Sequence, residues 1–291
     1  MTLLGELASL GAAACWAVGL NLFRRDVREI GARPVNLFKG VCGSVLFVAC
    51  LPLVGYVQAP AASVAAIALS GVLGVAIGDT LLFHALSRLG AHRAALLNGI
   101  GPVLTVIGGW LLLDERLNGW EIGGIALATA GVTAVVYFRS ADGPRPKIHR
   151  DGVLFGLAAA ACQSGGVLLT KHGLADMDAF SGSAVRLLAA TASLILYGFI
   201  RRDLDLDLKR LFRAGPLARL VPATLVGTFC GLWLMQTGIK HVESGIANAL
   251  LSTTPLFTLP IAVLVLKERM SPLAVVGSLV GVAGIVILFL S

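Results

Sequence analysis

The sequence predicts an all-α, polytopic membrane protein whose ten transmembrane helices form two inverted five-helix repeats. The first observation behind this prediction is composition, because 57% of the 291 residues are hydrophobic and only 13% are charged. A soluble domain of this length would leave too much apolar surface in water. The second observation is a series of apolar runs of roughly 20 residues, the length at which a helix crosses about 30 Å of hydrocarbon. The third is the internal repetition of a short pattern.

The apolar runs follow one another through the whole chain. We expect the first run to be retained rather than cleaved as a signal peptide, because no basic segment precedes it. The ten predicted spans lie at about 3–22, 34–55, 62–86, 92–113, 117–138, 152–170, 178–200, 217–238, 244–266 and 272–290.

The repeated pattern begins at a proline in the fourth span. Pro102 is followed by an apolar run, then by Glu115-Arg116, then by spaced glycines. The same order returns 153 residues later, from Pro255 through Glu268-Arg269 to a second set of glycines. Several landmarks that recur in register indicate that the chain contains two copies of one unit.

Each copy is predicted to hold five spans. We place the first repeat at residues 1–140 and the second at 151–291, joined by a short polar linker that is rich in Pro and Gly. Because five is an odd number, the second repeat must enter the membrane from the opposite side to the first. Two inverted repeats of this kind are typical of transporters, whose substrate site lies near the midplane between the repeats.

The basic residues predict the orientation of the chain. The formal net charge is +7, and 18 of the 23 Lys and Arg lie in the odd-numbered connections between spans. Basic connections stay in the cytoplasm, so both termini are expected to face outward. These residues occupy short connections rather than one face of a soluble domain, which argues against a nucleic-acid partner.

The doubled pattern resembles the EamA family of the drug/metabolite transporter superfamily, and the resemblance covers essentially the whole chain. It implies a ten-helix fold with a central cavity lined mainly by spans one to four and six to nine, while spans five and ten are peripheral. It also implies both termini in the cytoplasm, and here the charge distribution indicates the opposite orientation. Glu115 and Glu268 are signature positions, which we expect to be solvated or paired within their own repeat without touching substrate.

Lys39 and Asp79 are charged residues that we expect inside the membrane, roughly 9–12 Å deep at about 1.5 Å per residue. Lys39 lies in the second span and Asp79 in the third, both near the basic side. An ion pair between them could tie two helices together, or it could act as a gate or as a proton-coupling carboxylate. Both interpretations remain open from the sequence.

Arg186 is the residue that the repeat aligns with Lys39. The position that aligns with Asp79 is Leu232, so span eight offers Arg186 no acidic partner. A buried guanidinium could bind a substrate carboxylate or phosphate through two hydrogen bonds. The alternative is that it pairs with helix-end carbonyls, with Asp178 or with another side chain. Arg186 is our first candidate for a substrate contact.

Uncharged candidates lie where the two repeats differ. Trp16 aligns with Gln163, and either Trp16 or Trp233 could stack on substrate or simply anchor and pack. Asn98 precedes the proline of span four and could contact solute or satisfy the opened backbone. His84 could titrate near neutral pH and join a gate, although a lone histidine near a span end is more often a packing residue.

Pro102 and Pro255 are expected to bend spans four and nine. Each proline frees a backbone carbonyl one turn earlier in the helix. We expect these bends to be the moving parts of the protein.

Together these features predict a secondary or facilitative transporter of a small polar metabolite. An amino acid or a related anionic or zwitterionic compound is the leading substrate class, with export implied by the resemblance. A flippase for a lipid or lipid-linked sugar is the alternative. We expect no enzyme activity, no cofactor and no metal, because the five histidines are scattered and no phosphate-binding loop occurs. Besides the substrate, the expected partners are the lipid of the cell (inner) membrane and protons as coupling ions through Asp79; a homodimer is an open alternative to a monomer.

Overall fold

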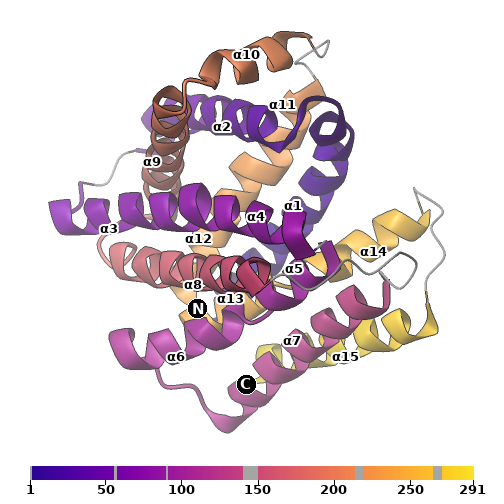
Figure 1. The fold of residues 1–291 in the computed structure, drawn as a ribbon. Coiled ribbons are helices and arrows are strands. Elements are labelled where there is room, and N and C mark those ends of the chain that lie inside the picture. The colour runs from indigo at the N-terminus through magenta and orange to yellow at the C-terminus, as the bar shows by residue number, and fades with distance from the viewer. Residues whose placement is uncertain (1, 56–57, 90, 140–149, 214–218, 265–270) are drawn as a thin grey trace.

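The structure is a computed structural model, and it describes residues 2–55, 58–89, 91–139, 150–213, 219–264 and 271–291. These segments are helical apart from their short connections, so the all-α prediction is confirmed (Figure 1). In the first half the helices are α1 (Thr2–Ile30), α2 (Ala32–Val54), α3 (Ala61–Gly71), the π-helix η1 (Val72–Gly78), α4 (Asp79–Leu89), α5 (Ala91–Asn98), α6 (Gly101–Leu113) and α7 (Gly119–Arg139).

The second half repeats this order with an added helix, α10. Its helices are α8 (Arg150–Gly173), α9 (Ala179–Ile200), α10 (Leu204–Arg213), α11 (Leu220–Ala223), the π-helix η3 (Thr224–Cys230), α12 (Gly231–His241), α13 (Ser244–Leu251), α14 (Thr254–Leu264) and α15 (Pro272–Leu290). Within the described residues, nine helices are long and apolar enough to cross a membrane. The remaining predicted span, 244–266, contains α13 and α14, and its last two residues lie outside the described part of the chain.

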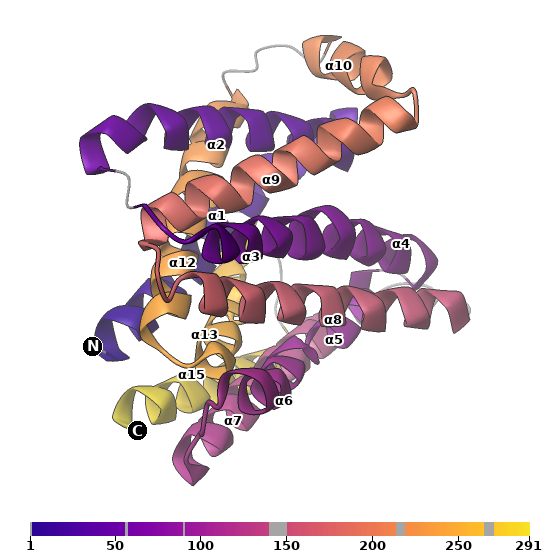
Figure 2. The ribbon, with the colours of Figure 1, turned by 90° about the vertical axis from the view of Figure 1, so that its left-hand side faces the viewer.

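The equivalent helices of the two halves run in opposite directions. α1 begins at the end of the bundle where both termini lie, whereas α8 ends there (Figure 2). We call this end the terminal end. We call the opposite end, which carries the connections rich in Lys and Arg, the basic end. The opposite directions agree with the predicted inversion of the repeats.

The two halves are interlocked rather than side by side. α1 of the first half packs most extensively on α12 and η3 of the second, and α8 of the second half packs on α3, η1 and α4 of the first. The peripheral pair is α7 and α15, which pack along each other at one side of the bundle (Figure 1).

Glycines permit the two central crossings. Gly19 in α1 lies close to Gly227 in η3, so that a Cβ on Gly19 would be 2.7 Å from the Cα of Gly227. At the equivalent crossing, a Cβ on Gly166 in α8 would lie 3.2 Å from the Cα of Gly74 in η1. Close approach of backbones through small residues is a common packing mode in membranes. Each crossing falls on a π-helix, a conformation that often marks functional segments.

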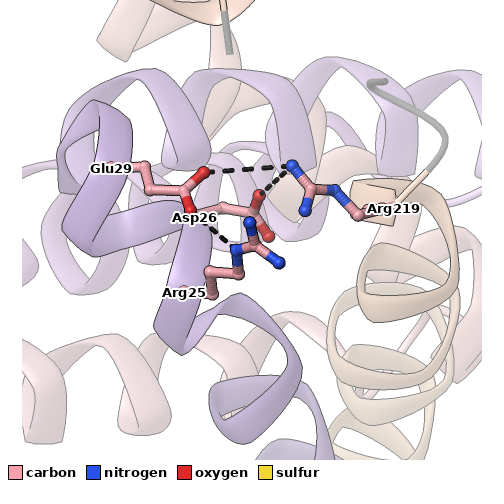
Figure 3. A network of polar contacts seen from close by, with 4 residues as sticks. All are labelled: Arg25, Asp26, Glu29 and Arg219. Carbon is pink, nitrogen blue, oxygen red and sulfur yellow. Dashed lines mark hydrogen bonds and ion pairs between the residues drawn. The ribbon is translucent and has the colours of Figure 1, made fainter. Parts of the chain in front are cut away.

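A charged network joins the halves at the basic end (Figure 3). On α1, Arg25 Nε donates to Glu29 Oε1 at 2.6 Å. Arg219, at the start of the second half's third span, lies 3.9 Å from both Asp26 and Glu29. The Arg25 hydrogen bond holds the pKa of Glu29 below its usual range. Arg25, Glu29 and Arg219 are exposed, so we expect their ion pairs to add little stability, although Asp26 itself is buried.

Arg33 makes a more buried connection at the same end. Its Nη2 donates to Asp203 at 2.7 Å, and its Nε lies 2.9 Å from the carboxylate of Asp207 on α10. The hydrogen bond from Arg33 holds the pKa of Asp203 below its usual range, whereas burial raises the pKa of Asp207. Arg33 thus fastens α10 to α2.

We expect Arg33→Met to destabilise the protein by about 1–3 kcal/mol, because Asp207 would be left buried with its charge unpaired. The loss should be largest at neutral pH and shrink on acidification, since protonation of Asp207 removes the uncompensated charge. Thermal unfolding in detergent between pH 5 and 8 measures this. Arg25→Met is the matched control, and an equal loss in both variants would contradict the prediction.

Candidate functional site

Asp79 lies at the point where η1 gives way to α4, half-buried inside the bundle. Its carboxyl group interacts electrostatically with two cations, Lys39 of α2 and Arg186 of α9. No ion pair within 4 Å joins Asp79 to either of them in the described part of the chain. One carboxylate therefore interacts with two cations and, within the described residues, forms an ion pair with neither.

Arg186 is only 4% exposed and is held mainly by hydroxyl groups. Its Nη1 donates to Ser70 Oγ at 2.9 Å and to the carbonyl of Gly166 at 3.3 Å, and it also donates to Thr170 Oγ1. Its Nε is buried without a hydrogen-bond partner. Span eight offers Arg186 no carboxylate, as predicted, but Asp79 of span three supplies the opposite charge.

The space for Arg186 comes from α3 and η1. A Cβ on Gly74 would lie 3.0 Å from Arg186 Nη2, and a Cβ on Gly71 would clash with the backbone carbonyl of Arg186. Thr170 Oγ1 also donates to Ser70 Oγ at 3.0 Å, so that α8 and α3 are joined beneath the guanidinium. Arg186 is thereby fixed between both halves of the molecule.

Trp16 and Gln163 occupy equivalent places in the two halves. A Cβ on Gly231 would lie 2.8 Å from the Trp16 indole, and a Cβ on Gly78 would lie 3.2 Å from Gln163 Cγ. Gly78 and Gly231 end or follow the π-helices of their respective halves. The repeat therefore places an indole at one π-helix and an amide at the other.

Trp233 belongs to an aromatic cluster to which both halves contribute. It packs edge-to-face on Phe180 at 5.4 Å between ring centroids, and Phe180 also contacts Phe47 and Phe229. With 41% of its surface exposed, Trp233 remains accessible. The described contacts leave both the stacking and the packing interpretations open.

Asn98 and the two prolines lie where spans four and nine are interrupted. α5 ends at Asn98 and α6 begins at Gly101, so Pro102 lies in the first turn of a new helix. Pro255 has the same place in α14, after α13 ends at Leu251. At each expected bend, a turn of two residues therefore interrupts the helix. Asn98 Oδ1 is buried without a hydrogen-bond partner.

His84 is not brought into the charge cluster. Its side chain is exposed, and its ring lies 5.4 Å from that of Phe155 on α8. Its predicted part in a gate stays a proposal.

The prediction that Glu115 is solvated or paired within its own repeat is wrong. Its carboxylate accepts hydrogen bonds from Ser244 N at 3.0 Å and Ser244 Oγ at 2.5 Å, across to the second half. Asp114 ends α6 in the left-handed conformation, with φ of 54°, and Gly109 leaves room for the returning carboxylate. The expected counterpart, Glu268, lies outside the described residues.

Sequence reasoning missed Ser70 and Thr170, although hydroxyls within apolar runs are a visible signal for buried polar contacts. It also missed both π-helices, for which the sequence carries no clear signal.

Two surface grooves lie away from the charge cluster. One, of about 420 Å³, is lined by Asp205, Leu208, Lys209 and Phe212 of α10. The other, of about 520 Å³, is lined by Val106, Trp110, Glu115, Arg116, Leu117 and Ile122. Among the described residues no group of His, Cys, Asp and Glu could hold a metal ion. The cluster of Asp79, Lys39 and Arg186 is therefore the candidate site.

The model of the EamA-like transporter family matches the chain twice, over residues 3–137 and 150–290. The chain belongs to the EamA-like transporter family. It is accordingly a multi-pass membrane transporter rather than an enzyme, and the resemblance stated from the sequence is confirmed.

Two curated relatives match nearly the whole of this EamA protein, and a third matches part of it. An uncharacterized transporter of Archaeoglobus fulgidus is 29% identical over 294 residues, covering 98% of this chain and 97% of the relative. A probable terminal-alkyne amino-acid exporter of Streptantibioticus cattleyicolor is 28% identical over 94% of this chain and 89% of its own. The threonine/homoserine exporter RhtA of Salmonella typhimurium is 32% identical over 125 residues, 41% of each chain.

A solved structure shares the fold of the EamA protein. A crystal structure matches with a TM-score of 0.79 over 98% of this chain and 96% of that chain, at 18% sequence identity. At this identity the likeness concerns the fold alone.

Proposed function

We propose that the chain exports a small zwitterionic metabolite, an amino acid or a close relative, across the cell (inner) membrane by alternating access. The observation that carries this proposal is the half-buried carboxylate of Asp79 between the cations Lys39 and Arg186. A zwitterion presents an ammonium and a carboxylate a few ångströms apart. The ammonium can bind Asp79 while the carboxylate binds a neighbouring cation.

Lys39 is the first cation that substrate would meet. Its side chain is half-buried, whereas Arg186 is almost fully buried and already donates to Ser70, Thr170 and Gly166. Arg186 remains in the proposed site, because its Nε has no hydrogen-bond partner and could share the substrate carboxylate. Trp16, Gln163, Asn98 and Trp233 remain candidates for the rest of the substrate.

The relatives support the same substrate class. Two of them carry names of amino-acid exporters, and one of these matches nearly the full length of the chain. A dianionic phosphate would suit two cations but would meet repulsion from an ionised Asp79. The charge cluster therefore favours a zwitterion over the headgroup of a lipid or lipid-linked sugar.

Transport in proteoliposomes tests this proposal. We expect counterflow of labelled threonine or homoserine, and only weak counterflow of the corresponding amine without a carboxylate and hydroxy acid without an ammonium. Lys39→Met should raise KM at least tenfold, while Lys209→Met on exposed α10 should transport normally. Equal transport of the hydroxy acid and the amino acid would contradict the role of Asp79. An imposed pH gradient in the same vesicles tests whether protons are coupled.

A further inference from the structure

The inverted repeats provide an internal measure of which end of the transporter is closed. In a fully symmetric protein, each contact at one end would have an equivalent contact at the other end. A contact without its equivalent therefore reports the access state of the structure.

The first unequal contact joins spans four and nine. At the terminal end α6 packs on α13, where Glu115 accepts from Ser244 N and Oγ. Further in, Asn248 Nδ2 donates to Thr105 Oγ1 at 2.6 Å. The equivalent helices at the basic end, α14 and α5, do not pack together in this way over their described backbone, and Glu268, the equivalent of Glu115, lies outside the described residues.

The second unequal contact joins spans seven and eight. α9 packs on α12, where Ser183 Oγ lies 3.4 Å from the carbonyl of Leu232. The equivalents of these two positions are Asn36 on α2 and Asp79 on α4. The backbones of α2 and α4, which the structure describes from end to end, do not pack together in the way that α9 and α12 do.

In both comparisons the contact is present at the terminal end, and its equivalent at the basic end is not observed. We infer that this conformation is closed at the terminal end and open toward the basic end, and that the Glu115–Ser244 contact is the latch of the closed end. In the opposite state α2 approaches α4, which brings Asn36 and Lys39 up to Asp79, while α13 leaves α6 and the latch opens. The gap between Asp79 and Lys39 is thus a consequence of the open basic end.

The geometry of the segment after α6, which contains Glu115, suits a latch. The backbone of Glu115 is fixed to α6, because its N–H donates to the carbonyl of Gly109 at 3.1 Å. The carboxylate caps the first residue of α13, an eight-residue helix that ends at the break before Pro255. Release of one side chain therefore frees one end of a short helix whose other end is already interrupted.

Cysteine labelling tests the inference without any substrate, so its outcome is independent of the proposed function. In a background without the five native cysteines, Thr105→Cys is fully buried between α6 and α13 and should react slowly with an impermeant maleimide. Adding Glu115→Ala should raise the labelling rate from the terminal side at least fivefold. Glu121→Ala is the matched control, because the carboxylate of Glu121 accepts from Asn118 N within the same half.

A cross-link provides the second test. Thr105→Cys with Asn248→Cys should form a disulfide in the resting protein, stop transport, and recover on reduction. If Glu115→Ala lowers thermal stability while terminal-side labelling stays unchanged, Glu115 is only structural and the inference is wrong. Full transport by the cross-linked protein would likewise overturn it.

Discussion

Asp79→Asn is expected to abolish transport. The amide has nearly the shape of the carboxylate, but it cannot bind a substrate ammonium as a counter-charge. The variant also leaves Lys39 and Arg186 without their shared carboxylate, so we expect a loss of stability of about 3 kcal/mol.

A second variant separates these two effects. In Asp79→Asn with Lys39→Met the charge balance inside the membrane is restored, and most of the lost stability should return. Transport should remain absent, because the groups proposed to hold the two ends of the zwitterion are gone. Unfolding temperature and amino-acid counterflow are measured on the same preparations. Recovery of transport along with stability would mean that Asp79 and Lys39 are only a structural pair.

Among substitutions that add one methyl group to the α7–α15 pair, we expect Gly131→Ala to lower the free energy of unfolding the most. A Cβ at this position would clash with the backbone of Gly281 and lie 2.7 Å from the carbonyl oxygen of Gly277. Backbone atoms of α15 cannot move aside as a flexible side chain can, so α7 and α15 must separate. Overpacking of this kind costs about 1–3 kcal/mol, and we expect the upper end of that range.

Gly123→Ala is the control on the same helix. A Cβ there meets nothing within 4 Å, and alanine is a better helix former than glycine by about 1 kcal/mol. The control should therefore unfold at the same temperature or higher. Thermal unfolding of both variants, followed by size-exclusion recovery, measures the difference. Equal stability of the two variants would refute the close crossing of α7 and α15.

The repeat was predictable because its landmarks serve local geometry. Pro102 and Pro255 each lie in the first turn of a new helix, a position that the ring of proline favours. Glycines such as Gly131 are required where two helices cross closely. The structural effect of such residues can be predicted without knowing which helix they contact. Two copies in register therefore indicated the duplication, and the odd number of spans in each copy indicated the inversion.

The partners of polar side chains were less predictable. Burial of Arg186 could be inferred from its position in an apolar run, but its partners, Ser70 and Thr170, lie on two other helices. The prediction for Glu115 was wrong for the same reason. Its carboxylate meets the first residue of α13 because the two halves interlock, and the sequence does not show which helices interlock. The periodicity of apolar residues indicates the face of a helix on which a residue lies. It does not indicate which other helix packs against that face.

Interlocking also bears on how the protein is made. The faces of α1 that later cover η3 and α12 have no partner while the ribosome is still synthesising the second half. The first five spans must therefore wait in the bilayer, with Gly19 and its neighbours facing lipid or an insertion chaperone, until residues up to about His241 have been inserted. Neither half can therefore bury these faces by itself.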